Sequence, residues 1–434
     1  MALPSVHGTE ELQEIQASEI REKILAGEPA EFDNRIIVGY LDLSGLIIAV
    51  PVHFNHSIFQ DPANFNYTTF NADAYFVKSN FCGDVHFLYS KFNRGANFLN
   101  SNFGSNANFW YSKFIADANF AQTQFRGIAD FWDSEFDRNA YFWYSKFYSI
   151  AFFGKSTFNG TASFRYSEFN DDVGFGVSNF NGGADFWYSK FNGNAYFDYD
   201  KFSKDADFNE AIFNKFASFN NSQFIANAFF KNTTFQGDLA LTETIYYKLF
   251  IRWYRIKHLI YDDTAYMSLM KNFNDLGYFE DYDSCYYQYR KEHRGQPWPG
   301  INPFEESVRK FFDMFLEIFY GYGKKPLLPL AWSFGTILVL GIFWGVIEQR
   351  RQEVNFNEYS CIQNINFKNK ITSMIKPFLF SATVFLSGTK LFIDPPEVPN
   401  KNSSLIKVAF IFERVLGALF SILFFLAISG TVIR

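Results

Sequence analysis

The residues whose types could support chemistry lie close together near the C-terminus, at positions 383–390. In order, they are Thr383, Val384, Phe385, Leu386, Ser387, Gly388, Thr389 and Lys390. Rings of backbone carbonyls or of charged side chains can select an inorganic ion, and neither breaks a covalent bond. The sequence carries no Gly-rich phosphate loop, nucleophile elbow or His–acid pair. It therefore predicts ion binding without enzymatic activity, and no catalytic or cofactor-binding residues.

Charge and cysteine content argue against other kinds of site. The formal net charge of −6 gives no general affinity for nucleic acid, which requires a basic surface. Cys82, Cys285 and Cys361 lie far apart, and the six histidines form no metal-ligand pattern. We therefore expect no nucleic acid, metal, cofactor or disulfide.

Two apolar stretches flank the candidate segment. Residues 327–347 are 21 uncharged residues, enough at about 1.5 Å per residue to cross a hydrocarbon core of about 30 Å. Residues 415–433 are also uncharged, and Glu413 and Arg414 stand at the entrance of this second predicted span, 413–433. The apolar stretch between them, 371–386, is too short to cross, and the segment 371–389 is a candidate re-entrant helix. Residues 304–320 are amphipathic and are predicted, within the segment 301–325, to lie along the surface of the lipid bilayer.

A regular series of phenylalanines fills much of the rest of the chain. From Phe54 to Phe235, 34 phenylalanines are spaced alternately five and six residues apart. A strict short repeat indicates a solenoid, since each unit buries its apolar face only against its neighbours. Nearly every Phe has a small residue two positions before it, and side chains two positions apart lie on the same face of an extended chain, which predicts a four-sided coil of 22 residues over 51–240. The predicted structural core includes Phe98, Phe109, Phe120, Phe131, Phe186 and Phe191.

The flanks of this series are predicted to be a cap and a connector. Residues 1–50 would cap the solenoid, with a helix over 10–25 and a first coil without Phe. Residues 241–300 would be helical, with one helix over 242–259 and an αα-hairpin turning at Gly277. Trp110, Trp143 and Trp187 point outward, either as a surface for a protein partner or as simple stacking between coils.

Ala96-Asn97-Phe98, Ala107-Asn108-Phe109 and Ala129-Asp130-Phe131 resemble the units of the pentapeptide-repeat family. This resemblance implies a right-handed quadrilateral β-helix. Residues 326–434 resemble the two-span pore-loop ion channels of potassium-channel ancestry. Fusions of the two modules occur in prokaryotes, particularly archaea, and their middle domain is similar to the segments around Lys271-Asn272-Phe273 and 285–290. The resemblance implies a homo-tetramer around one pore for a permeant inorganic ion.

The resemblance fails at the filter. Potassium selectivity depends on a Thr-Val-Gly-Tyr-Gly type sequence, whereas here Thr383-Val384 is followed by Phe385-Leu386-Ser387-Gly388-Thr389. We therefore predict that the pore does not select potassium. Four copies of Lys390 near the mouth would favour anions, unless Lys390 snorkels to the interface or pairs with Asp394. Anion conduction, non-selective cation conduction and no conduction remain open.

The expected location is the cell membrane, with several spans and the β-helix on the cytoplasmic side. The acidic N-terminal region has no apolar signal core, and large domains do not follow the positive-inside rule. Basic residues over 350–376 argue for the opposite orientation. The expected function is an oligomeric channel with a degenerate filter and a β-helix for gating, spacing or docking. The alternative is a membrane-anchored rod that binds a protein and does not conduct.

Overall fold

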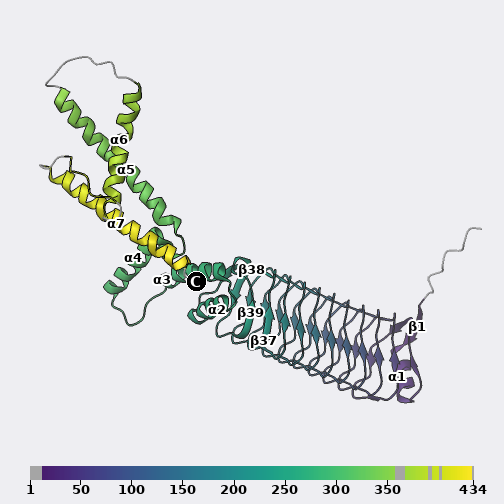
Figure 1. The fold of residues 1–434 in the computed structure, drawn as a ribbon. Coiled ribbons are helices and arrows are strands. Elements are labelled where there is room, and N and C mark those ends of the chain that lie inside the picture. Colours follow the sequence, from purple (N-terminus) through teal and green to yellow (C-terminus); the bar gives the residue numbers. More distant parts are fainter. Residues whose placement is uncertain (1–11, 357–366, 390–392, 400–402, 433–434) are drawn as a thin grey trace, which may run out of the picture. The chain divides into compact units, whose positions relative to one another are not determined.

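The computed structural model describes residues 12–356, 367–389, 393–399 and 403–432. The chain divides into two compact units, Met1–Cys285 and Tyr286–Arg434. The first contains coiled β-structure followed by helices, and the second is helical (Figure 1). The predicted mixed fold class is confirmed.

Most of the first unit is a parallel β-solenoid in which each coil pairs with the coil 22 residues before it, as Ala96 does with Ala74. It begins with β1 (Gln13–Gln16), β2 (Ala30–Glu31), β3 (Arg35–Val38), β4 (Leu41–Asp42), β5 (Ile47–Ile48) and β6 (Val52–His53). Strands β7 to β36 have two residues each, from Ile58–Phe59 to Ala217–Ser218. The last are β37 (Gln223–Phe229), β38 (Thr234–Ala240), β39 (Ile245–Phe250) and β40 (Ile256–Leu259).

The phenylalanines form the core of the solenoid. All six predicted core residues named above are fully buried. Rings one coil apart stack face to face, with centroids 4.8 Å apart for Phe98 and Phe120 and 4.7 Å apart for Phe109 and Phe131. Aromatic pairs at such distances stabilise beyond the area they bury. The 22-residue period is therefore fixed by packing as well as by strand pairing.

The corners explain the alternation of five and six residues. The tight corner turns through a residue with positive φ every eleven residues, such as Tyr67 at 58° and Val177 at 68°. Positive φ is uncommon for residues other than Gly, and for a β-branched side chain it is strained. The wider corner passes close to the previous coil, so that a Cβ on Gly160 would lie 2.4 Å from the carbonyl carbon of Arg138. Glycine is needed there for close approach of two backbones.

A ladder of buried hydroxyl groups lines the tight corners, and Asp200 takes the place of one hydroxyl in this ladder. Each hydroxyl donates to the carbonyl of a core residue 25 positions earlier, as Ser178 does to Phe153 at 2.7 Å and Thr68 does to Leu43 at 2.8 Å. Asp200 Oδ1 accepts from the backbone N–H of Ser178 at 2.7 Å, but its Oδ2 is buried without a hydrogen-bond partner. Burial raises the pKa of the Asp200 carboxyl well above its ordinary value. The folded solenoid therefore favours the protonated acid.

We expect Asp200→Ser to stabilise the solenoid by about 1–3 kcal/mol at pH 7, because it replaces an unsatisfied buried group with the hydroxyl of the ladder. Since the pKa of Asp200 is raised in the folded state, the parent protein loses stability as pH rises from the ordinary Asp pKa to the raised folded pKa. The gain should therefore shrink as pH is lowered toward 4. Circular dichroism melting of the full chain across pH tests this. A gain that does not change with pH would contradict the titration of Asp200.

The N-terminal end differs from the prediction in two ways. The helix α1 spans only Ala17–Leu25, and Gln13–Gln16 form β1, which pairs with β3. The first coil is not free of Phe, because Phe32 is buried and stacks on Phe54 at 5.3 Å. The aromatic ladder thus begins one coil earlier than the regular spacing shows.

The C-terminal end of the solenoid also corrects the prediction. Residues 242–259 were expected to be helical, but they form β39, a short 3-10 turn η1 (Trp253–Arg255) and β40. β39 pairs with β37 and β40 pairs with β38, each through a register shift. Their apolar residues have spacings compatible with a helix, and the exposed strand edge of the preceding coil overrides that pattern. The β-solenoid therefore continues to Leu259.

The predicted αα-hairpin is present. Helix α2 (Asp263–Asp275) is capped by the Asp262 side chain, and α3 (Phe279–Gly295) follows a turn in which Gly277 has φ of 71°. The buried Asn272 side chain accepts from Leu249 N at 3.0 Å and donates to Leu249 O at 2.8 Å. These bonds fix α2 against the last coil.

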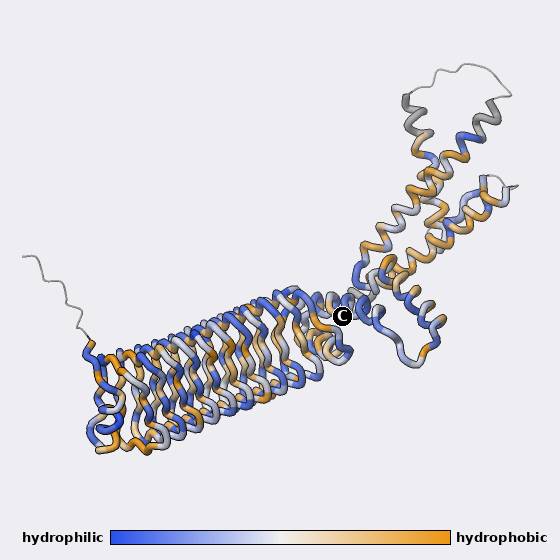
Figure 2. The backbone as a smooth tube through the Cα atoms, turned by 180° about the vertical axis from the view of Figure 1, so that it is seen from behind, coloured by the Kyte–Doolittle hydropathy of each residue, from blue (hydrophilic) through white to orange (hydrophobic). Residues whose placement is uncertain are grey.

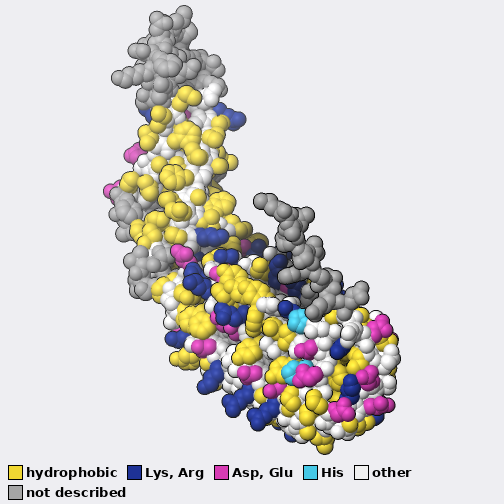
Figure 3. Space-filling view, turned by 90° about the vertical axis from the view of Figure 1, so that its right-hand side faces the viewer, with side chains coloured by type: hydrophobic (Ala, Val, Ile, Leu, Met, Phe, Trp, Pro, Cys, Tyr) yellow, Lys and Arg dark blue, Asp and Glu magenta, His cyan; other side chains and the backbone are white. Residues whose placement is uncertain are grey.

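The second unit contains α4 (Pro303–Tyr320), the turn η2 (Gly321–Gly323), α5 (Leu327–Phe356), α6 (Phe367–Leu386) and α7 (Ser404–Val432). Two helical segments are long and apolar enough to cross a membrane, Leu327–Arg350 in α5 and Ser404–Ser429 in α7. Only 11% and 28% of their apolar windows are buried within the chain, which is unlike the core helix of a soluble protein. Figure 2 shows these hydrophobic runs in orange, and Figure 3 shows the exposed hydrophobic side chains.

Candidate functional site

Helices α5, α6 and α7 meet around one buried carboxylate. Glu413 in α7 has no exposed surface, and Trp344 Nε1 in α5 donates to Glu413 Oε2 at 2.7 Å. The Ser381 hydroxyl in α6 hydrogen-bonds Glu413 Oε1 and contacts the Ile337 carbonyl of α5 at 3.0 Å. One side chain therefore links all three helices, and we call Trp344, Ser381 and Glu413 the polar triad.

Apolar packing surrounds the polar triad. Trp344 packs with Val384, Ile406 and Phe410 in one buried cluster, which draws on all three helices. A second cluster joins Phe385 of α6 to Phe420 and Leu423 of α7. The triad is thus enclosed in a packed three-helix core and is sheltered from solvent within the chain.

The C-terminal end of α6 approaches the backbone of α7 very closely. A Cβ on Gly417 would lie 1.9 Å from the carbonyl oxygen of Phe385, and a Cβ on Gly388 would lie 2.2 Å from that of Arg414. No side chain fits at either position without separating the two helices. Gly388 was predicted as a filter residue, and the structure places it at this backbone contact.

The other candidate filter residues lie at the end of the same helix. Val384, Phe385 and Ser387 are buried within the chain, and Leu386 is 38% exposed. The Thr383 hydroxyl donates to the Leu379 carbonyl of its own helix at 2.8 Å. Gly388 and Thr389 are partly exposed, whereas Lys390 lies outside the described residues. The side chains of Val384, Phe385 and Ser387 are thus engaged in packing within one chain.

Glu413 and Arg414 are placed differently from the prediction. They were expected at the entrance of the second span, but α7 begins at Ser404, so both lie well inside the helix. The sequence carried a signal for this position, because residues 405–412 are apolar except for Lys407. The contribution of Trp344 and Ser381 was missed altogether. Only the folded chain shows that these residues, 69 and 32 positions from Glu413, meet it.

Comparison with known proteins identifies the repeat. A model of pentapeptide repeats matches residues 54–102 and 142–190. The solenoid is built of pentapeptide repeats. Neither a curated protein nor a solved structure matches the chain. The expectation from the sequence is thus confirmed for the repeat, and the resemblance of residues 326–434 to ion channels stays a prediction.

The outward residues of the pentapeptide repeats stack between coils. Tyr89 and Tyr111 lie 4.6 Å apart, as do Tyr144 and Tyr166. The Arg165 guanidinium lies 4.5 Å from the centre of the Trp187 ring. Stacking between coils accounts for these contacts, and none of them identifies a partner.

The repeats also assemble one group that the sequence analysis missed. Glu31, Asp33 and His53 bring their ligand atoms within 4.8 Å of one another, because positions 22 apart are stacked. His53 Nε2 lies 3.7 Å from Glu31 Oε1. These side chains are exposed or half-buried, and such acidic groups are common without an ion.

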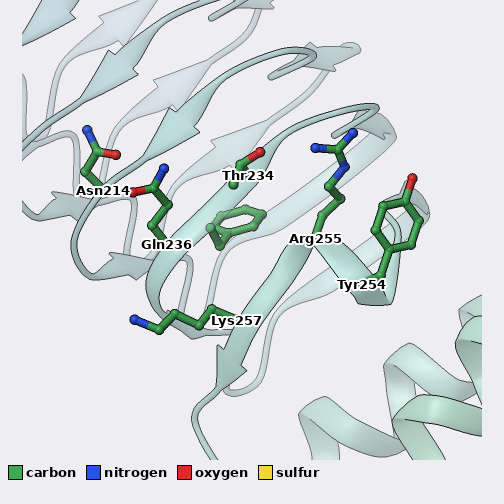
Figure 4. A pocket seen from close by; sticks show the side chains of 7 residues that line it. Asn214, Thr234, Gln236, Tyr254, Arg255 and Lys257 are labelled. Carbon is green, nitrogen blue, oxygen red and sulfur yellow. The ribbon is translucent and has the colours of Figure 1, made fainter.

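A broad, open pocket lies at the last coil of the solenoid (Figure 4). It has a volume of about 640 Å³, and its lining side chains are mainly polar. They are Asn214, Thr234, Phe235, Gln236, Tyr254, Arg255 and Lys257. Figure 4 shows Arg255 and Lys257 at separate ends of the pocket, so they do not converge on one point.

A charged network holds the amphipathic helix α4 against α3. Asp313 is buried and accepts hydrogen bonds from Arg290, from Arg294 at 3.3 Å and from the Tyr322 hydroxyl at 2.6 Å. Arg294 also pairs with Glu317. Desolvation of the phenol, together with its hydrogen bond to the Asp313 carboxylate, raises the pKa of Tyr322 above its ordinary range. The phenol therefore stays protonated and acts as a donor. The polar face of α4 is therefore fixed.

The opposite face of α4 is exposed and hydrophobic. Phe304 is 80% exposed, and Phe311 and Phe312 are both more than half exposed. An exposed row of large apolar side chains next to a candidate span is typical of a helix that lies in a membrane interface.

Proposed function

We propose that the protein is an oligomeric ion channel of the cell membrane, which conducts ions when several copies assemble around α6. The observation that carries this proposal is the polar triad, which holds α6 against the two candidate spans although the apolar part of α6, Met374–Leu386, is shorter than either span. Buried ionisable groups within membrane segments are costly and usually functional. A plain membrane anchor needs neither a third helix nor a buried carboxylate to hold it.

The remaining elements fit the same proposal. The exposed face of α4 would lie on the lipid bilayer, and its polar face is fixed to α3 through Asp313. The pentapeptide-repeat solenoid would lie on the cytoplasmic side, where it serves gating, spacing or docking of a protein. A tetramer is the expected assembly, by resemblance to pore-loop channels.

A second candidate is a membrane-anchored rod that does not conduct. It is favoured by the burial of Val384, Phe385 and Ser387 within one chain, because these residues were the expected ion path. In the channel proposal the path runs instead past the partly exposed Gly388 and Thr389, at the surface where copies would meet.

Single-channel recording from the purified full-length protein in a planar bilayer tests the proposal. We expect discrete currents in asymmetric potassium chloride. We expect no currents from Gly417→Ala, whose Cβ would separate α6 from α7. Gly335→Ala is the matched control, since nothing lies within 4 Å of its Cβ. Silence from folded, inserted parent protein would favour the anchored rod.

A further inference from the structure

The guanidinium of Arg414, a residue of α7, lies beside the C-terminal end of α6. The proposed function above assigns no role to this cationic group. We infer that the Arg414 guanidinium binds a small inorganic anion such as chloride, and that it makes the proposed pore select anions. This inference rests on the proposed function for conduction, and it can be tested separately as a binding site.

The depth of Arg414 in α7 is the first observation. The candidate span runs from Ser404 to Ser429, so that Arg414 lies within about 4 Å of its midpoint along the helix. A guanidinium at that depth is costly unless it faces the interior of a bundle or a water-filled cavity and meets a counter-charge. Arg414 is partly buried, and its long side chain does not reach a helix end from the middle of the span.

The hydrogen-bond partners of Arg414 are the second observation. A guanidinium has five N–H donors. Arg414 Nη2 donates to the carbonyl oxygen of Ser387 at 3.5 Å, which is a long contact, and the Arg414 Nε is buried without a partner. Among the described residues no carboxylate pairs with Arg414. The neighbouring Glu413 is engaged by Trp344 and Ser381 on another face of α7.

The place of this guanidinium is the third observation. The two glycine contacts between α6 and α7 fix the end of α6 beside Arg414. One donor on the Ser387 carbonyl could simply cap the C-terminus of α6, where a cation is favourable. Capping uses one donor and leaves the charge without a counter-ion. An anion at the same point would satisfy the remaining donors and the charge together.

The test compares permeability in proteoliposomes that contain the full-length protein in asymmetric potassium chloride. We expect the current through the parent protein to reverse near the equilibrium potential of chloride. Arg414→Gln should lower the chloride-to-potassium permeability ratio by tenfold or more, on the order expected for removing one charge close to the ion path. Arg414→Lys should keep the preference for anions. Lys407→Gln, an exposed position two turns earlier in α7, is the control and should leave the ratio unchanged.

A cation-selective parent, or an Arg414→Gln variant with an unchanged ratio, would overturn the inference and leave the channel standing. Lys390→Gln serves as a comparison, because a loss of anion preference there and not at Arg414 would also overturn it. A parent protein that gives no current would overturn the proposed function. A measurement of chloride binding would then decide whether the anion site at Arg414 exists. Chloride-35 NMR line broadening in detergent that is lost in Arg414→Gln supports the site, and equal broadening in both proteins overturns it.

Discussion

Gly417→Ala should weaken the packing of α6 against α7. A Cβ at this position would lie 1.9 Å from the Phe385 carbonyl oxygen, a backbone atom that cannot rotate away. We expect the contact between the helices to lose about 3 kcal/mol or more, as in severe overpacking. Hydrogen exchange measured by mass spectrometry on α6 peptides should then become about a hundredfold faster, since each 1.4 kcal/mol is tenfold.

Gly335→Ala provides the matched control for this substitution. Gly335 lies in α5 with nothing within 4 Å of its Cβ, and alanine is the better helix former by about 1 kcal/mol. Exchange of α6 should be unchanged in this variant. If α6 exchanged at the parent rate in Gly417→Ala as well, the close approach of the two helices would be wrong.

Glu413→Leu should loosen all three helices of the candidate pore. It leaves the buried Trp344 Nε1 without an acceptor and removes one of the two partners of the Ser381 hydroxyl. An unsatisfied buried donor costs about 1–3 kcal/mol, and hydrogen bonds between membrane helices contribute about 1–2 kcal/mol at most. We expect exchange in α5 around Trp344 and in α6 to quicken by about tenfold.

Glu413→Gln distinguishes hydrogen bonding from charge. The amide oxygen accepts from Trp344, and its N–H donates to Ser381, which is then free to donate to the Ile337 carbonyl. Exchange should stay close to the parent rate. Thr336→Val is the control, because that exposed hydroxyl bonds only the Trp332 carbonyl of its own helix. Equal acceleration in Glu413→Gln and Glu413→Leu would show that the carboxylate charge stabilises the bundle.

The solenoid could be predicted from the sequence because its 22-residue coil follows from a repeat of neighbouring residues. Ala and Phe two positions apart determine which face of each strand is buried, and the spacing of five and six residues determines the length of the coil. Each unit therefore repeats the same local pattern. Its ends could not be read in this way. Phe32 lies outside the regular series, and residues 242–259 join the sheet because an unpaired strand edge was available.

The two apolar helices could also be predicted, because length and hydropathy are properties of a segment by itself. The candidate site could not. Trp344 and Glu413 are 69 residues apart, and no local pattern pairs a tryptophan with a distant carboxylate. The role of Gly388 likewise depends on where the backbone of Arg414 lies. The sequence alone determined the repeat and the apolar helices through local periodicity and composition. Only the tertiary structure decided which polar groups meet, because those contacts join separate helices.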